Sequence, residues 1–278
     1  MIWKILKAVV IGIVEGITEW LPVSSTGHMI LLNELIHLDV SDEFYEMLLV
    51  VIQLGAILAV PILFWDRLWP FSKGKSLEQM RKTLGLWGRV ALGALPCAVL
   101  GLLLDDLIDR YLFGYLTVAI MLIVYGVVFI FVEKIRAENK FRIESVYDID
   151  YSDALRIGAF QALSLIPGTS RSGATILGGM LTGVSREAGA EFSFFMAIPI
   201  MLGASGLKIL KFTLGGFIPN GDELMLLFVG IIVSFAISLF AIRFLMDFVK
   251  HHDFKIFGYY RIALGLIVII YFLVKSFV

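Results

Sequence analysis

The stretch EGITEWLPVSSTGH, residues 15–28, places two carboxylates, four hydroxyl groups and an imidazole close together in a strongly hydrophobic chain. Glu15 and Glu19 are four residues apart, so on a helix both side chains lie on the same face. Like charges at this spacing repel each other, and removing both from water is costly. Mg²⁺ and Ca²⁺ bind carboxylate oxygens and can hold phosphate oxygens at the same time. We therefore expect Glu15 and Glu19 to bind one of these ions; a solvated acidic face is the alternative interpretation.

The residues after this acidic pair could supply a nucleophile and a proton carrier. Pro22 cannot continue a helix interior, so the chain is expected to turn here and to begin a short return arm near His28. Histidine exchanges protons near neutral pH and can activate a neighbouring serine. The hydroxyl groups next to it are those of Ser24, Ser25 and Thr26. Each of them alone would be an ordinary helix N-cap.

A second polar segment, IPGTSRSGAT at 166–175, has the features of an anion site. Arg171 lies between Ser170 and Ser172, and Gly168 allows the backbone to approach a ligand closely. A helix that begins here would present free amide groups, and the planar guanidinium matches phosphate oxygens. An arginine that only neutralises the glutamate pair is the alternative. An anion site that faces two carboxylates implies a metal ion between them, and hence a phosphorylated substrate.

Composition indicates the elements that must position these residues. Of the 278 residues, 59% are hydrophobic and 17% are charged, and the mean hydropathy is +0.91. The apolar residues occur in runs about as long as a bilayer is thick, which predicts an all-α polytopic membrane protein. The net charge of −1 gives no indication of a nucleic-acid partner. Six spanning helices are expected at about 44–65, 85–104, 112–132, 191–212, 224–249 and 256–277.

Two apolar segments are too short to cross a bilayer. Met29–Leu38 and Ala174–Gly183 have ten residues each, about 15 Å of helix, roughly half of the hydrocarbon core. Each follows one of the polar stretches. Such pieces fit re-entrant helical hairpins, which are stable where protein or a water-filled cavity covers them.

The chain also repeats itself. Residues 21–28 are similar to 166–175, 40–43 to 184–187, and 44–56 to 192–204, in the same order. Each half then contains one hairpin and three spanning helices. Because three is odd, the second half enters the membrane with the opposite orientation, as in an inverted-topology repeat. We expect a single membrane domain over 1–278, with repeats at about 1–135 and 150–278.

The repeat predicts one composite site rather than two. Gln161 stands about where Glu15 would be, and Ser164 or Leu165 stands near Glu19. Only the first hairpin therefore keeps the acidic pair, whereas the second hairpin contributes Arg171. The substrate is expected between the tips of the two hairpins, residues 23–27 and 167–175.

Loop charges predict the orientation. The segments 66–82, 133–152 and 250–255 are rich in basic residues, whereas 105–110 is net acidic. The positive-inside rule puts the basic segments in the cytoplasm, and it puts 105–110 and 212–222 outside. The site is then expected to open to the outer face of the membrane.

The EGITE pair, LPVSSTGH, PGTSRSGAT and QLGAILAV at 53–60 resemble the undecaprenyl-diphosphate phosphatase family of the bacitracin-resistance type. The resemblance implies a bacterial plasma-membrane hydrolase that converts undecaprenyl diphosphate to undecaprenyl phosphate and phosphate. That activity recycles the lipid carrier of cell-wall synthesis and confers bacitracin resistance. The resemblance also implies a divalent metal at the acidic pair. The site residues that it implies are Glu15, Glu19, Ser25, His28 and Arg171, with Ser170 and Thr175 as phosphate-loop hydroxyls; Gly168, Ser172 and Ser24 are further candidates for substrate contact.

The mechanism expected at this stage has Ser25 attack the terminal phosphoryl group while His28 carries protons. In a variant, His28 attacks directly or activates water. The main alternative function is a secondary transporter or flippase of an anionic lipid, because inverted repeats with broken helices also build transporters. A purely structural scaffold does not explain the polar tips. The metal, the prenyl chain length and the oligomeric state, a homodimer being one option, stay open.

Overall fold

The computed structural model describes residues 1–112, 114–136 and 141–277. Within these ranges the regular structure is helical, and the extended backbone forms one isolated bridge, between Ile143 and Val184. Six helices are long and apolar enough to cross a membrane. They are α3 (Asp42–Leu63), α5 (Leu77–Tyr111), α6 (Tyr115–Arg136), α9 (Arg186–Leu214), α10 (Gly221–His251) and α11 (Lys255–Phe277). Each contains one of the six predicted apolar segments or most of it, so the prediction of an all-α polytopic membrane protein is confirmed.

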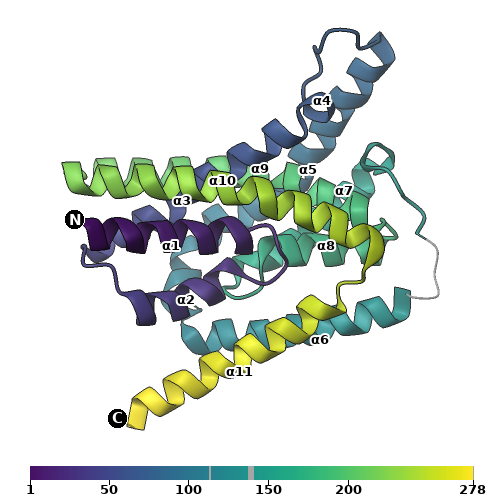
Figure 1. Cartoon of the computed structure of the whole chain (residues 1–278). Coiled ribbons are helices and arrows are strands. Elements are labelled where there is room, and N and C mark those ends of the chain that lie inside the picture. The colour runs from purple at the N-terminus through teal and green to yellow at the C-terminus, as the bar shows by residue number, and fades with distance from the viewer. Residues whose placement is uncertain (113, 137–140, 278) are drawn as a thin grey trace.

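Shorter helices form the two hairpins (Figure 1). In the first, α1 (Ile2–Thr18) packs against α2 (Ser25–Ile36). In the second, α7 (Tyr151–Ala162) and the 3₁₀ turn η2 (Leu163–Leu165) pack against α8 (Arg171–Thr182). The remaining short elements are α4 (Trp65–Leu68) and the 3₁₀ turn η1 (Val146–Asp148).

The predicted helix ends were less accurate than the predicted centres. Residues 105–110 were expected in an outer loop, but α5 continues through them to Tyr111. A fall in hydropathy marks the edge of an apolar run, whereas a helix continues until its backbone geometry changes. Helix starts follow capping side chains instead: Ser185 caps α9, and Asn220 caps α10 well before its apolar part. In the predicted basic segment 133–152, residues 133–136 belong to α6, and 137–140 lie outside the described residues.

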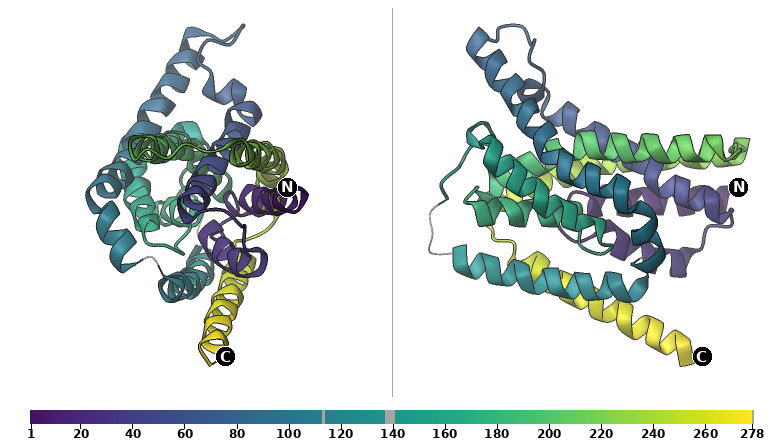
Figure 2. Two further views of the ribbon diagram at one scale, coloured as in Figure 1. Left: turned by 90° about the vertical axis from the view of Figure 1, so that its left-hand side faces the viewer. Right: turned by 180° about the vertical axis from the view of Figure 1, so that it is seen from behind.

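Small residues let the hairpins approach the long helices closely. α1 packs on α10 and α7 packs on α5, while α6 and α11 lie side by side (Figure 2). A Cβ added at Gly12 would lie 3.0 Å from the Gly230 carbonyl oxygen, and one added at Gly158 would lie 2.1 Å from that of Gly93. Glycine at such crossings permits backbone contact between membrane helices. The hairpins are thus held against α10 and α5 at backbone distance.

The contact between α7 and α5 gives a test of this packing. Gly158→Ala forces the two helices apart, and we expect it to lower the free energy of unfolding by about 1–3 kcal/mol. Gly203→Ala is the control, because a Cβ at Gly203 meets no atom within 4 Å and alanine favours a helix. Thermal unfolding of both purified variants in detergent measures the difference. Equal melting temperatures would contradict the proposed close packing.

Candidate active site

The two hairpin tips have the same local structure. Ser24 and Ser170 are the non-glycine residues with positive φ in the described chain, at 73° and 71°. Each is an N-cap whose hydroxyl oxygen accepts a hydrogen bond from a glycine amide, at 3.4 Å from Gly27 and 3.2 Å from Gly173. Positive φ is unfavourable for serine, and the cap hydrogen bond helps to offset its cost. Both tips therefore end at a helix N-terminus, where backbone amides suit an anion.

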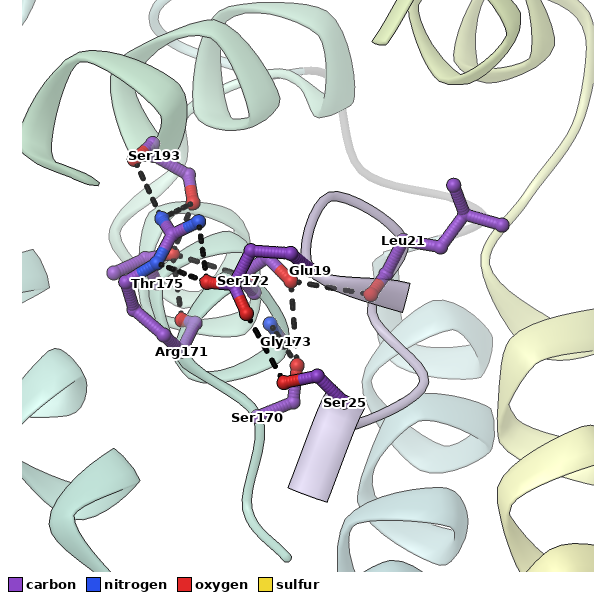
Figure 3. Close-up of polar contacts among 9 residues, drawn as sticks. All are labelled: Glu19, Leu21, Ser25, Ser170, Arg171, Ser172, Gly173, Thr175 and Ser193. Carbon is purple, nitrogen blue, oxygen red and sulfur yellow. Dashed lines mark hydrogen bonds and ion pairs between the residues drawn. The ribbon is translucent and has the colours of Figure 1, made fainter. Parts of the chain in front are cut away.

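Glu19 joins the reactive groups of the two tips (Figure 3). Its Oε2 accepts a hydrogen bond of 3.0 Å from the Ser25 hydroxyl. Its Oε1 forms an ion pair with Arg171, at 3.4 Å from Nε. Three of the residues expected to share a site thus meet, although Arg171 lies 152 residues after Glu19 in the chain.

A hydrogen bond to α9 and an aromatic ring of the first hairpin hold Arg171 in place. Its Nη1 donates to the Ser193 carbonyl oxygen at 2.9 Å, and its guanidinium carbon lies 5.6 Å from the centre of the Trp20 ring. Thr175 supports this arrangement, because its hydroxyl lies 2.5 Å from that of Ser193. Thr175 is fully buried. The resemblance implied that the Thr175 hydroxyl contacts phosphate. In the structure this hydroxyl contacts Ser193 instead, and Thr175 does not line the cavity described below.

Both hairpins line one cavity of about 200 Å³. The first hairpin contributes Glu19, Ser25 and Thr26, and the second contributes Ser164, Leu165, Gly168, Ser170 and Arg171. Gln53 of α3, Cys97 of α5 and three apolar residues of α9 complete the wall. A single shared cavity agrees with the expectation of one composite site.

Two serines predicted to bind substrate hold the tips instead of lining the cavity. The Ser172 hydroxyl donates to the Leu21 carbonyl oxygen at 3.3 Å and so ties the second tip to the first. Ser24 is buried, and its own carbonyl oxygen lies 2.7 Å from Nδ1 of His28. The hydrogen bonds of both residues therefore stabilise the hairpin tips.

His28 does not meet Ser25. Its Nδ1 faces the Ser24 carbonyl, and its Nε2 lies 2.6 Å from the Tyr260 hydroxyl, with the two rings stacked at 5.6 Å. Because α2 begins at Ser25, the serine turns back toward Glu19 while His28 turns toward α11. The expected serine–histidine pair is therefore absent among these residues, and Glu19 is the hydrogen-bond partner of Ser25.

The acidic pair fits a hard divalent cation. Glu15 is buried, and its Oε1 has no hydrogen-bond partner in the described structure. The Glu19 carboxylate and the Gln53 side chain lie within interaction range of it. An unpartnered carboxylate oxygen in a buried place is what a cation would complete. No group of three or more His, Cys, Asp or Glu side chains that could hold a metal ion occurs in the described ranges. Further ligands would therefore be neutral oxygens, from the Gln53 amide, water or substrate.

Arg261 of α11 is a residue of this region that the sequence reasoning missed. It is fully buried, and it donates to Pro22 of the first tip at 3.2 Å and to Gly168 and Thr169 of the second tip at 2.8 and 2.9 Å. All four acceptors described for it are backbone carbonyls. The signal was present, since a charged residue inside an apolar spanning segment is a functional candidate by default.

Removal of Arg261 should loosen both tips. Arg261→Met keeps most of the length of the side chain but leaves at least three buried carbonyl groups without a donor. We expect a loss of unfolding free energy on the order of 3 kcal/mol. Arg243→Met, at an exposed position of α10, is the matched control. Thermal unfolding in detergent compares the two, and a similar melting temperature for both variants would rule out this role of Arg261.

Comparison with known proteins places the chain among membrane proteins of one family. The undecaprenyl-diphosphatase of Acetivibrio thermocellus is 55% identical over 270 residues, which cover 97% of this chain and 98% of the relative. Proteins with the same name from Enterococcus faecalis and Streptococcus mutans are 54% and 52% identical, over 96% and 99% of this chain and 96% and 98% of their own lengths. The profile of the family described as bacitracin resistance protein BacA matches residues 8–267. The chain belongs to this family.

Proposed function

We propose that this protein is an integral membrane phosphatase that hydrolyses undecaprenyl diphosphate to undecaprenyl phosphate and inorganic phosphate. The observation that carries the proposal is the hydrogen-bonded set Ser25–Glu19–Arg171 at the wall of one cavity. The names of relatives more than 50% identical over nearly the whole chain support the same substrate. The activity would return the lipid carrier of cell-wall synthesis to use and thereby oppose bacitracin.

The chemistry begins at Ser25. Its Oγ attacks the terminal phosphorus while Glu19 Oε2, which already accepts its hydrogen bond, takes the proton. The bond from phosphorus to the bridging oxygen breaks, and undecaprenyl phosphate leaves with that oxygen and the proton. Water then attacks the phosphoserine, gives one proton back to Ser25 through Glu19, and releases phosphate. One water molecule is consumed in each cycle.

Arg171 stabilises the charge of the transferred phosphoryl group. Its guanidinium is fixed by Ser193 and by the Trp20 ring, so its orientation is set before substrate binds. Phosphoryl transfer depends mainly on such fixed positive groups. The free amides at the start of α8 add to the same effect.

His28 has a positioning role in this proposal. Both of its ring nitrogens already have partners, one in the tip backbone and one in Tyr260 of α11. The side chain thereby fixes the first turn of α2, which carries Ser25. We therefore assign the proton transfer to Glu19 and do not retain direct attack by His28.

A Mg²⁺ or Ca²⁺ ion would be held by Glu15 and Glu19. The unpartnered Oε1 of Glu15 supports this assignment. When bound, such an ion supplies positive charge that neutralises the diphosphate oxygens.

The membrane arrangement that fits this function is an inverted repeat with the hairpins re-entering from opposite sides. The equivalent packing of α1 on α10 and of α7 on α5 supports it, as does the shared geometry of Ser24 and Ser170. The loop charges favour a site that opens to the outer face, where the spent diphosphate carrier would be processed.

The nucleophile is tested with purified protein in detergent. We expect Ser25→Ala to lower phosphate release from a long-chain prenyl diphosphate at least about 1,000-fold, because the attacking oxygen is lost. His28→Gln should retain far more activity, since the attacking and accepting atoms remain. Rapid quenching with a substrate labelled in its terminal phosphate should trap label on Ser25 of the wild type. Label on His28, or full phosphate release by Ser25→Ala, would exclude the mechanism. No phosphate release by well-folded wild type would favour a transporter.

The metal is tested by binding as well as by activity. EDTA should abolish phosphate release, and Mg²⁺ should restore it. Glu15→Gln should weaken Mg²⁺ binding, measured by calorimetry, by at least about tenfold, because a charged oxygen ligand becomes a neutral amide. Glu46→Gln is the control, because it removes the same negative charge from an exposed position of α3. Unchanged Mg²⁺ affinity in Glu15→Gln would remove the pair from the metal site.

A further inference from the structure

A polar corner of the second hairpin has no role in the mechanism above. Gln161, near the end of α7, is fully buried, and neither its Oε1 nor its Nε2 has a hydrogen-bond partner in the described structure. Buried amide groups are nearly always paired, because an unpaired one loses its hydrogen bonds to water without replacement. Two unpaired atoms on one side chain therefore leave hydrogen-bonding capacity that a ligand or water could use.

The surroundings of Gln161 belong to the cavity already described. The Cys97 thiol lies within interaction range of the Gln161 amide and of the Ser164 hydroxyl, and also near the Arg171 charge. Cys97 and Ser164 both line the cavity. Gln161 itself is fully buried next to Cys97, directly behind the part of the wall formed by α5 and the start of the second tip.

The cavity has room for more than the group that Arg171 holds. Its volume of about 200 Å³ corresponds to roughly seven water molecules at about 30 Å³ each. A single phosphoryl group with its oxygens needs less than this. A diphosphate also has a second phosphoryl group, the one that stays on the prenyl chain, and it needs donors of its own.

The chemistry of Gln161 suits that second group. Gln161 lies 146 residues after Glu15 and stands at the corresponding place in the repeat. A carboxylate there would repel a phosphate, whereas an amide donates to it without adding negative charge. A neutral donor can also stabilise the charge that develops on the departing prenyl phosphate.

We infer that Gln161, together with the Ser164 hydroxyl, forms the subsite for the prenyl-linked phosphoryl group, while Arg171, Glu19 and Ser25 hold the terminal one. The inference rests on the proposed function and assigns the two phosphoryl groups of the substrate to different residues of the cavity. The first hairpin and Arg171 act on the phosphate that is removed, and the corner of the second hairpin binds the phosphate that is retained.

The test separates the two halves of the substrate. Gln161→Met keeps the length of the side chain and removes both polar atoms, so it should fold and unfold at a temperature no lower than the wild type. We expect kcat/KM for a prenyl diphosphate to fall about 100-fold. Competitive inhibition by prenyl monophosphate should weaken at least about tenfold, while inhibition by inorganic phosphate should not change. Arg171→Lys should give the opposite pattern, and Leu163→Met, at an exposed position of η2, is the control for the substitution itself.

Each outcome has one meaning. Equal inhibition constants in wild type and Gln161→Met would overturn the subsite, whatever the effect on kcat. A parallel loss for both inhibitors would indicate a general distortion of the cavity and would also overturn it. If the wild type released no phosphate, the proposed function would fail. Direct binding of prenyl monophosphate to wild type and to Gln161→Met, measured by calorimetry, would then still test the subsite.

Discussion

The site depends on one buried cation that has carbonyl groups rather than carboxylates as its acceptors. Arg261 reaches from α11 to Pro22 in the first tip and to Gly168 and Thr169 in the second. These three residues lie in two irregular turns, where buried carbonyl groups have no partner within a regular helix and need a donor from elsewhere. One guanidinium with several fixed donors satisfies them together. The same bonds hold the tips at a fixed separation, so the cavity between them and the contact of Glu19 with Arg171 follow from Arg261.

The two arginines of the site have different tasks because their partners differ. Arg261 is enclosed by backbone, with its guanidinium near the Tyr125 ring, and its hydrogen bonds are used within the fold. Arg171 also lies against an aromatic ring, but its charge faces Glu19 at the cavity wall. A buried charge paired with one carboxylate can exchange that partner for a phosphate at little cost, whereas a charge that holds a turn together cannot. Position, and not residue type, decides which arginine is available to substrate.

The sequence predicted those parts of the structure that depend on local patterns. Hydropathy located the six long helices, and the order of the repeated segments placed Arg171 opposite Glu19. The sequence did not predict the directions in which these side chains point. Ser25 and His28 are three residues apart and suggested a pair, but the start of α2 at Ser25 sends them to opposite partners. Likewise, the burial of Thr175 depends on the packing of α8 against α9, and the reach of Arg261 spans 239 residues to Pro22.

Electrostatics also explains why a repeated scaffold carries an asymmetric site. If both hairpins had kept glutamate pairs, four carboxylates would surround one cavity with a single arginine at its wall. Burying four carboxylates together would cost more free energy than one divalent ion and Arg171 could offset. A neutral Gln161 in place of a second Glu15 removes that conflict and leaves the second hairpin free to bind anions. A cavity shared by the two proposed repeats therefore favours halves that differ in charge. In the proposed mechanism this difference would orient the substrate, with one phosphate toward the acidic pair and the other toward the amide.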